Sequence, residues 1–206
     1  MIVCAGKSEQ FSFAQPVGIG MIESAINLSR ICEIKKPDYI IFVGTAGSYG
    51  EKEIFEIVES RTAANIEQAF FTQDAYTPID NMVSAYGGTE GDAPLVATLL
   101  AQSSLTSFKG AHVSRETLES REAIVNTSNY ITTNKEIWKY YTAQSIHLEN
   151  MEFFAVLKVA QMYGISAVGI FIVTNYCDEN AHEDFLKNHK EAMQRLDLYV
   201  KARVGK

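Results

Sequence analysis

The sequence predicts an α/β fold, a three-layer sandwich in which helices flank a central, twisted, mixed but mostly parallel sheet. Segments typical of strands alternate along the chain with segments typical of helices, which is the pattern of such sandwiches. Tyr39–Val43 and Ile165–Thr174 are continuous apolar runs, as expected for parallel strands that are buried on both faces. Apolar residues also recur at helical spacing from Glu183 onward, which predicts an amphipathic C-terminal helix.

The elements before the first long strand are short and end at clear signals. Met1–Ala5 predicts a buried strand, and Gly18 and Gly20 predict a turn further along. Apolar residues at helical spacing from Ile22 predict a helix, which Pro37 ends. The first long apolar strand then leads into the glycine-rich segment GTAGSYG, where the backbone is expected to turn.

The rest of the chain is predicted from local patterns. A capping box, Thr133 with Glu136, should open a helix that runs through Tyr141. The region from Asp80 to Gly110 shows no clear pattern, and no element is predicted there. The remaining predicted elements are the strands Glu53–Val58, Ile66–Phe71 and Ala123–Thr127 and the helix Met151–Tyr163, ended by Gly164.

Composition narrows the function classes. With 206 residues, 47% of them hydrophobic and 21% charged, the chain suits one domain over residues 1–206. The net charge is −7 and the 18 basic residues are scattered, so neither nucleic acid nor an anionic membrane surface is expected as a partner. No apolar run reaches the roughly 18 residues of a membrane span. Three widely spaced cysteines indicate reduced thiols in a cytoplasmic protein.

Three polar segments follow predicted strands, and ligands of open α/β sheets bind beyond the carboxyl ends of strands. These segments are GTAGSYG, NTSNYI and TNYCDENAH. A fourth segment, HLENMEFFAV, places Glu152 where an apolar helix is about to begin. A carboxylate there must face water, find a partner or bind a ligand. The sequence alone leaves these three alternatives open.

Read in order, the segments resemble the nucleoside phosphorylase and nucleosidase family. The stretches that carry the resemblance are PVGIGMIESAINLSRICEIKKPDYIIFVGTAGSYG and NMEFFAVLKVAQMYGISAVGIFIVTN. The resemblance implies the nucleoside phosphorylase fold. It also implies that Glu152 accepts hydrogen bonds from the ribose 2′ and 3′ hydroxyls while Met151 packs on the sugar. A fixed carboxylate would stabilise the positive charge that builds on the sugar as the bond to the base breaks.

The resemblance also implies how a purine would be recognised. Many members carry an aspartic acid at the end of the last strand, whereas this chain has Asn175, which cannot release a proton at neutral pH. Asn175 and His182 instead resemble the trimeric phosphorylases of 6-oxopurine nucleosides, where the asparagine binds the base and the histidine contacts the ribose 5′ hydroxyl. Tyr130 would stack on the purine, and the backbone of Ile131 would bind its edge. Glu152 and Asn175 are thus the predicted catalytic pair.

The nucleophile is predicted to be phosphate, a co-substrate. Thr45, with the amides of Ala46 and Gly47, would face it, and the loop Gly6, Lys7 and Ser8 would substitute for the family's phosphate loop. The position of a phosphate-binding arginine in part of the family is Phe42 here. Water is the alternative nucleophile, with Glu9 as the residue that activates it.

The sequence therefore favours a purine nucleoside phosphorylase that makes free base and ribose 1-phosphate. The alternatives are a purine nucleosidase that uses water, and a protein that binds purine nucleosides without turnover. No metal and no organic cofactor is implied. The resemblance further implies a homo-oligomer of unknown order.

Overall fold

A computed structural model of the chain describes residues 1–85 and 123–204. Most of the region for which no element was predicted, Asp80–Gly110, lies outside the described residues. The strands are β1 (Ile2–Cys4), β2 (Gln15–Pro16), β3 (Tyr39–Ser48), β4 (Ile57–Ser60), β5 (Thr62–Ala64), β6 (Met82–Ser84), β7 (Ile124–Thr127), β8 (Ile146–Asn150) and β9 (Ser166–Tyr176). The helices are α1 (Gly20–Lys35), α2 (Gln68–Phe71), a 3-10 turn (Lys135–Ile137), α4 (Trp138–Thr142), α5 (Phe153–Tyr163) and α6 (Ala181–Val204).

The described strands form one mixed sheet in the order β2-β1-β3-β8-β7-β5-β6, with β9 paired to β3 and β4 to β9. Its longest ladder is the parallel pair β3 and β9, which runs from Tyr39 opposite Ser166 to Ser48 opposite Tyr176. The other parallel pairs are β1 with β2, β1 with β3, β5 with β7 and β7 with β8. The antiparallel pairs involve β3 with β8, β4 with β9 and β5 with β6. The predicted mixed, mostly parallel sheet is confirmed.

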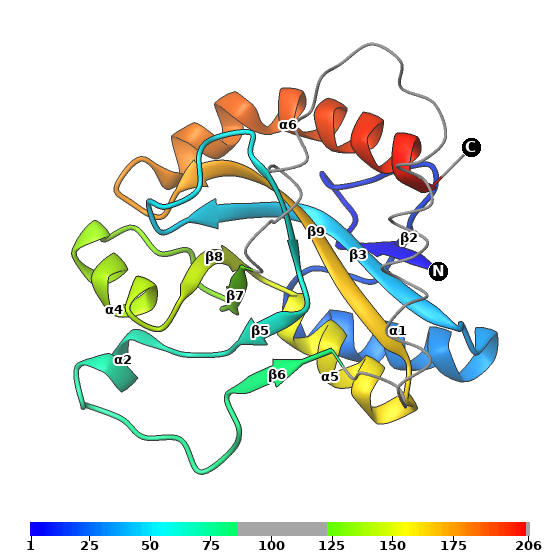
Figure 1. Cartoon of the computed structure of the whole chain (residues 1–206), viewed down its shortest axis with the longest axis horizontal. Helices are drawn as coiled ribbons and strands as arrows, with labels where there is room; N and C mark the ends of the chain where they lie inside the picture. The colour runs from blue at the N-terminus through cyan, green and yellow to red at the C-terminus, as the bar shows by residue number, and fades with distance from the viewer. Residues whose placement is uncertain (86–122, 205–206) are drawn as a thin grey trace, which may run out of the picture.

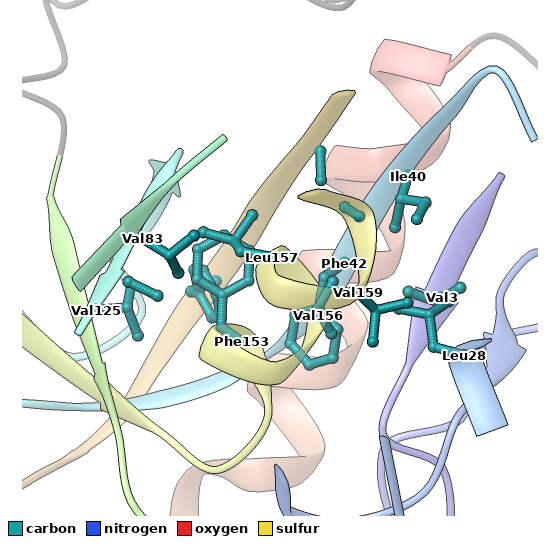
Figure 2. Packing of buried hydrophobic residues seen from close by; sticks show 14 of the residues in the cluster. Val3, Leu28, Ile40, Phe42, Val83, Val125, Phe153, Val156, Leu157 and Val159 are labelled. Carbon is teal, nitrogen blue, oxygen red and sulfur yellow. The ribbon is translucent and has the colours of Figure 1, made fainter. Parts of the chain in front are cut away.

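Helices cover both faces of this sheet, as Figure 1 shows: α6 crosses one face, and α1 and α5 lie side by side on the other. Alternate residues of β3 point to opposite faces, so Phe42 packs toward α5 while Val43 packs toward α6. Figure 2 shows the α5 side, where Phe153, Val156 and Leu157 meet the sheet. The three predicted layers are therefore present.

Helix ends follow the expected signals. α5 ends at Gly164, which has the left-handed φ of 66° that a glycine adopts without strain. α1 ends at Lys35, and its C-cap residue Lys36 stands directly before Pro37. The capping residue before the 3-10 turn is Asn134 instead of the predicted Thr133, because the Asn134 side chain accepts from the backbone N–H of Glu136.

The predicted strand Ile66–Phe71 is wrong, because Gln68–Phe71 forms helix α2. The backbone N–H of Ile66 donates to the side-chain oxygen of Asn126 (2.9 Å), and its C=O accepts from the Asn126 amide (3.1 Å). A side chain, and not a neighbouring strand, therefore satisfies the backbone at this apolar residue. The apolar side chain of Ile66 is buried, but the apolar character of this segment led to the prediction of a strand where the chain forms a helix.

Two other predicted boundaries are wrong. Of Glu53–Val58 only the last two residues belong to β4, because Phe55 adopts a φ of 69° and the Glu56 N–H bonds to the Glu53 carbonyl in a turn. The segment GTAGS does not turn but continues β3 to Ser48, since β9 and β8 pair with it on both sides. The turn comes at Gly50, with a φ of 93°.

The three cysteines are buried and free of disulfides. Within residues 1–85 and 123–204, no helix has the length and apolar character needed to cross a membrane.

Candidate functional site

A cavity of about 270 Å³ opens beside the last residues of β3 and β9. It includes every residue that the sequence predicted for the site except Lys7. Lys7 lies exposed on a tight turn with a φ of 54°, outside the cavity lining. The lining residues are Ala5, Gly6, Ser8, Glu9, Ile19, Thr45, Ala46, Gly47, Tyr130, Ile131, Glu149, Asn150, Met151, Glu152, Thr174, Asn175, Ala181, His182 and Phe185.

The Glu152 carboxylate does not face water. The residue is 3% exposed and occupies the N-cap position of α5. One carboxylate oxygen accepts from the backbone N–H of Gly20 (2.9 Å), and the other accepts from the side-chain amide of Asn150 (2.9 Å). A carboxylate has about four acceptor positions, so part of its acceptor capacity is left for a ligand.

Burial is the main reason why the pKa of Glu152 is raised, to about 7. The negative charge of Glu9 raises this pKa further, while the hydrogen bond from Gly20 lowers it. The carboxyl group therefore gains or loses its proton close to neutral pH. A cationic neighbour would stabilise the ionised form.

Glu9 turns its carboxylate inward to the end of β3. The backbone N–H of Thr45 donates to one oxygen (3.1 Å), and the Thr45 hydroxyl donates to the other in a very short bond. A side chain at Gly44 would place its Cβ 2.9 Å from the same carboxylate, so glycine permits this approach. Burial raises the pKa of Glu9 above its ordinary value, and the two bonds from Thr45 oppose the shift.

Asn175 lies near the end of β9 and is 7% exposed. Its side-chain oxygen accepts from the Thr174 hydroxyl (2.9 Å), and its NH₂ group donates to the Tyr176 carbonyl (3.0 Å). One of its two N–H bonds is left for a ligand. His182 is exposed on the first turn of α6 and borders the same cavity.

Tyr130 and Ile131 are 76% and 55% exposed, on the loop that follows β7. They line the main cavity and also a second cavity of about 260 Å³ on the other side of the loop. Their exposure fits residues that would contact a flat ligand rather than pack in the core.

Sequence reasoning missed Glu149 and Asn150 as site residues. Glu149 is 7% exposed, and its carboxylate accepts from the hydroxyls of Tyr49 (2.7 Å) and Thr132 (2.6 Å). The Asn150 side-chain oxygen accepts from the backbone N–H groups of Glu152 (2.7 Å) and Phe153 (2.8 Å). An asparagine just before an apolar helix is a capping signal, so Asn150 could have been found. Nothing local identified the partners of Glu149.

The electrostatic character of the cavity is acidic. Glu9, Glu149 and Glu152 line it, and none of the described lining residues is lysine or arginine. Thr45, Ala46 and Gly47, predicted to face phosphate, border it, and the described part of the lining gives them no lysine or arginine as a neighbour. The arrangement suits a ligand that develops positive charge better than an anion.

A family model described as the phosphorylase superfamily matches residues 2–204. The chain belongs to the phosphorylase superfamily. The fold agrees with that of solved members, so the predicted nucleoside phosphorylase fold is confirmed. A comparison with curated protein sequences gave no match.

Several solved structures are similar to this superfamily member. Futalosine hydrolase of Helicobacter pylori matches with a TM-score of 0.74 at 13% identity, over 98% of this chain and 95% of that one. The 5′-methylthioadenosine/S-adenosylhomocysteine nucleosidase of S. pneumoniae, solved with a transition-state inhibitor, matches with a TM-score of 0.71 at 14% identity, over 98% and 96%. The corresponding nucleosidase of Neisseria meningitidis matches with a TM-score of 0.71 at 16% identity, over 98% and 96%. At these identities the likeness concerns the fold.

Because the pKa of Glu152 is raised, the free energy of unfolding should depend on pH. The folded chain holds this proton up to a pKa of about 7, whereas an unfolded glutamate releases it near 4.5. The stabilising contribution is therefore fully present below about pH 4.5 and is lost as the pH rises through about 7. Glu152→Gln does not titrate and should lack this loss. Between about pH 5 and about pH 8, the free energy of unfolding of the wild type should fall by roughly 2 kcal/mol relative to that of the variant.

Urea denaturation of both proteins across this range measures the difference. Parallel pH profiles for the two proteins would show that the Glu152 carboxyl titrates in the folded chain as it does in the unfolded one.

Proposed function

We propose that the protein is a purine nucleosidase, which cleaves the bond between ribose and a purine, with a 6-oxopurine nucleoside as substrate and water as nucleophile. The observation that carries this proposal is the acidic cavity, in which Glu9 and Glu152 lie among described lining residues that include no lysine or arginine. Similar folds belong to proteins named as nucleosidases and hydrolases, which supports the same choice.

The acidic charge of the cavity favours water over phosphate as the nucleophile. Phosphate carries up to two negative charges near pH 7 and would enter a cavity that holds three glutamates. Lys7, predicted for a phosphate loop, is exposed and is not among the described residues that line the cavity. Water needs no positive charge, only a base. Glu9 supplies a carboxylate whose geometry Thr45 fixes through two hydrogen bonds.

Glu152 would promote cleavage of the bond between the ribose and the purine. As the bond between C1′ and the purine breaks, its electron pair moves to the base and the sugar takes up positive charge. The free acceptor capacity of Glu152 would bind the ribose 2′ and 3′ hydroxyls, and Met151 borders the same space. A buried carboxylate stabilises the cationic sugar more than the neutral substrate, which is the condition for a faster reaction.

The water oxygen then bonds to C1′ and its proton passes to Glu9, so that free ribose forms. The departing purine carries the electron pair of the broken bond and gains a proton from solvent, while Glu9 returns its proton to solvent. Asn175 would stabilise the departing base through its free N–H, without transferring a proton. A 6-oxopurine anion spreads its charge over the ring, so this reaction does not require an acid at Asn175.

The proposal is tested by measuring inosine cleavage with and without phosphate and by identifying the sugar product. We expect free ribose and a rate that does not depend on phosphate. Two substitutions in the same turn sharpen the test. Glu9→Gln should lower kcat by roughly 10²–10⁴-fold, as expected for a lost general base. Lys7→Met should leave the rate unchanged.

A phosphate-dependent rate with ribose 1-phosphate as product would instead support the phosphorylase, and loss of that rate in Lys7→Met would locate its phosphate. Inosine or hypoxanthine that binds without any turnover at high protein concentration would indicate the non-catalytic alternative.

If Asn175 contacts the base, its substitution should change which purine nucleoside is preferred. Asn175→Asp replaces the donor with a carboxylate, which when ionised only accepts hydrogen bonds and when protonated can act as an acid. The ratio of kcat/KM for inosine to that for adenosine should fall by about tenfold or more, the size of one hydrogen bond to a charged group. An unchanged ratio would show that Asn175 does not contact the base.

A further inference from the structure

We propose that Glu149 is a positioning residue that fixes one wall of the purine site. It does so by holding the loop Ser128–Thr132, called here the purine loop, against β8, which pairs with the end of β3. The proposal rests on the proposed function only where it assigns the purine to this wall.

Protein groups occupy most of the acceptor positions of the Glu149 carboxylate. One oxygen accepts from the hydroxyls of Tyr49 (2.7 Å) and Thr132 (2.6 Å). The other accepts from the backbone N–H of Thr132 (2.8 Å) and lies 4.0 Å from the thiol sulfur of Cys177. A carboxylate has about four acceptor positions. Although Glu149 borders the cavity, its acceptor capacity is thus used mainly by protein groups, and it acts through the groups it holds.

The purine loop is attached at a few points. At its start the Ser128 N–H donates to the Asn150 carbonyl (3.1 Å). In its middle the Asn129 side chain accepts from the Met21 N–H (3.2 Å). At its end Thr132 uses both its backbone and its hydroxyl donor on Glu149. Tyr130 and Ile131 lie between the last two attachments and are exposed, so the bond to Glu149 fixes the end of the loop that carries them.

The same carboxylate also lies near Cys177, which follows β9. A Cβ added at Gly47 would come within 2.8 Å of the Cys177 sulfur and within 3.1 Å of the Asn175 amide nitrogen. Cys177 and Asn175 thus lie against one backbone position of β3. Glu149 connects the purine loop to the strand end that carries Asn175.

Tyr49, another partner of the Glu149 carboxylate, stacks on Tyr141. The ring of Tyr49 lies 4.2 Å from that of Tyr141 with an angle of 4° between the planes. The Tyr141 hydroxyl donates in turn to the Ile66 carbonyl (3.0 Å). Burial raises the pKa of Glu149, and the hydrogen bonds from Thr132 and Tyr49 oppose this shift, which favours the ionised form that holds the loop.

The main test compares Glu149→Ala with a matched control, Glu59→Ala. Glu59 is also a partly enclosed glutamate that accepts from a tyrosine, Tyr199 (3.0 Å), and from Arg203 (2.9 Å), on β4 away from the cavity. Hydrogen exchange of the purine loop and the Kd for hypoxanthine by calorimetry are measured for both. In Glu149→Ala, loop exchange should rise and the Kd should weaken, each by about tenfold or more. Glu59→Ala should change neither.

Thr132 offers a second pair of variants if Glu149→Ala does not fold. Thr132→Val removes the hydroxyl and should shift both measurements in the same direction, whereas Thr132→Ser retains it and should resemble the wild type. The double variant Glu149→Ala/Thr132→Val should be no worse than Glu149→Ala alone, because both changes remove the same contact.

Unchanged loop exchange in Glu149→Ala and Thr132→Val would overturn the positioning role, whatever the enzyme's activity. Faster loop exchange with an unchanged hypoxanthine Kd, or a wild type that binds no purine, would overturn the assignment of the purine to this wall. A wild type that binds hypoxanthine through this loop and yet cleaves no nucleoside would contradict the proposed function and leave the role of Glu149 supported.

Discussion

The buried carboxylate of Glu152 is the feature on which the site depends, because an ionised group 3% exposed requires partners from several parts of the chain. Those partners are the N–H of Gly20, at the start of α1, and the amide of Asn150, at the end of β8. Glu152 itself occupies the N-cap position of α5, so the starts of two helices that pack side by side converge on one residue, although its side chain makes no capping bond to α5. The dipole of α1, whose first N–H contacts the carboxylate, favours a negative charge at this place.

The convergence at Glu152 also determines which groups line the cavity. Gly20 has a φ of 80°, which lets the first turn of α1 bring its N–H to Glu152. Glu9 reaches the same cavity from the turn after β1 and is fixed by Thr45 on β3. A nucleoside that enters would meet a carboxylate near the sugar and a carboxylate near the attacking water. The acidity of the site is thus the physical link between the sheet topology and the proposed use of water.

Sequence patterns predicted the elements whose signal is burial or the periodic spacing of apolar residues. The apolar runs of β3 and β9 and the amphipathic α6 identified the sandwich, and the order of the polar segments identified most of the cavity lining. The patterns failed where a long-range polar contact decides the structure. Asn126 turned the apolar segment at Ile66 away from a strand, and pairing with β8 and β9 kept the glycines of GTAGS extended. Glu149 could not be assigned, because its partners Tyr49 and Thr132 lie 100 and 17 residues away.

The most direct measurement of the central claim is the discrimination between inosine and 2′,3′-dideoxyinosine by the wild type and by Glu152→Gln. If Glu152 binds the ribose hydroxyls, the wild-type ratio of kcat/KM for the two substrates should be large. That ratio should fall by about tenfold or more in the variant, because a bond to a charged acceptor becomes a bond to a neutral one. If both proteins discriminate to the same extent, the buried carboxylate does not bind the sugar, and the account of the site is contradicted.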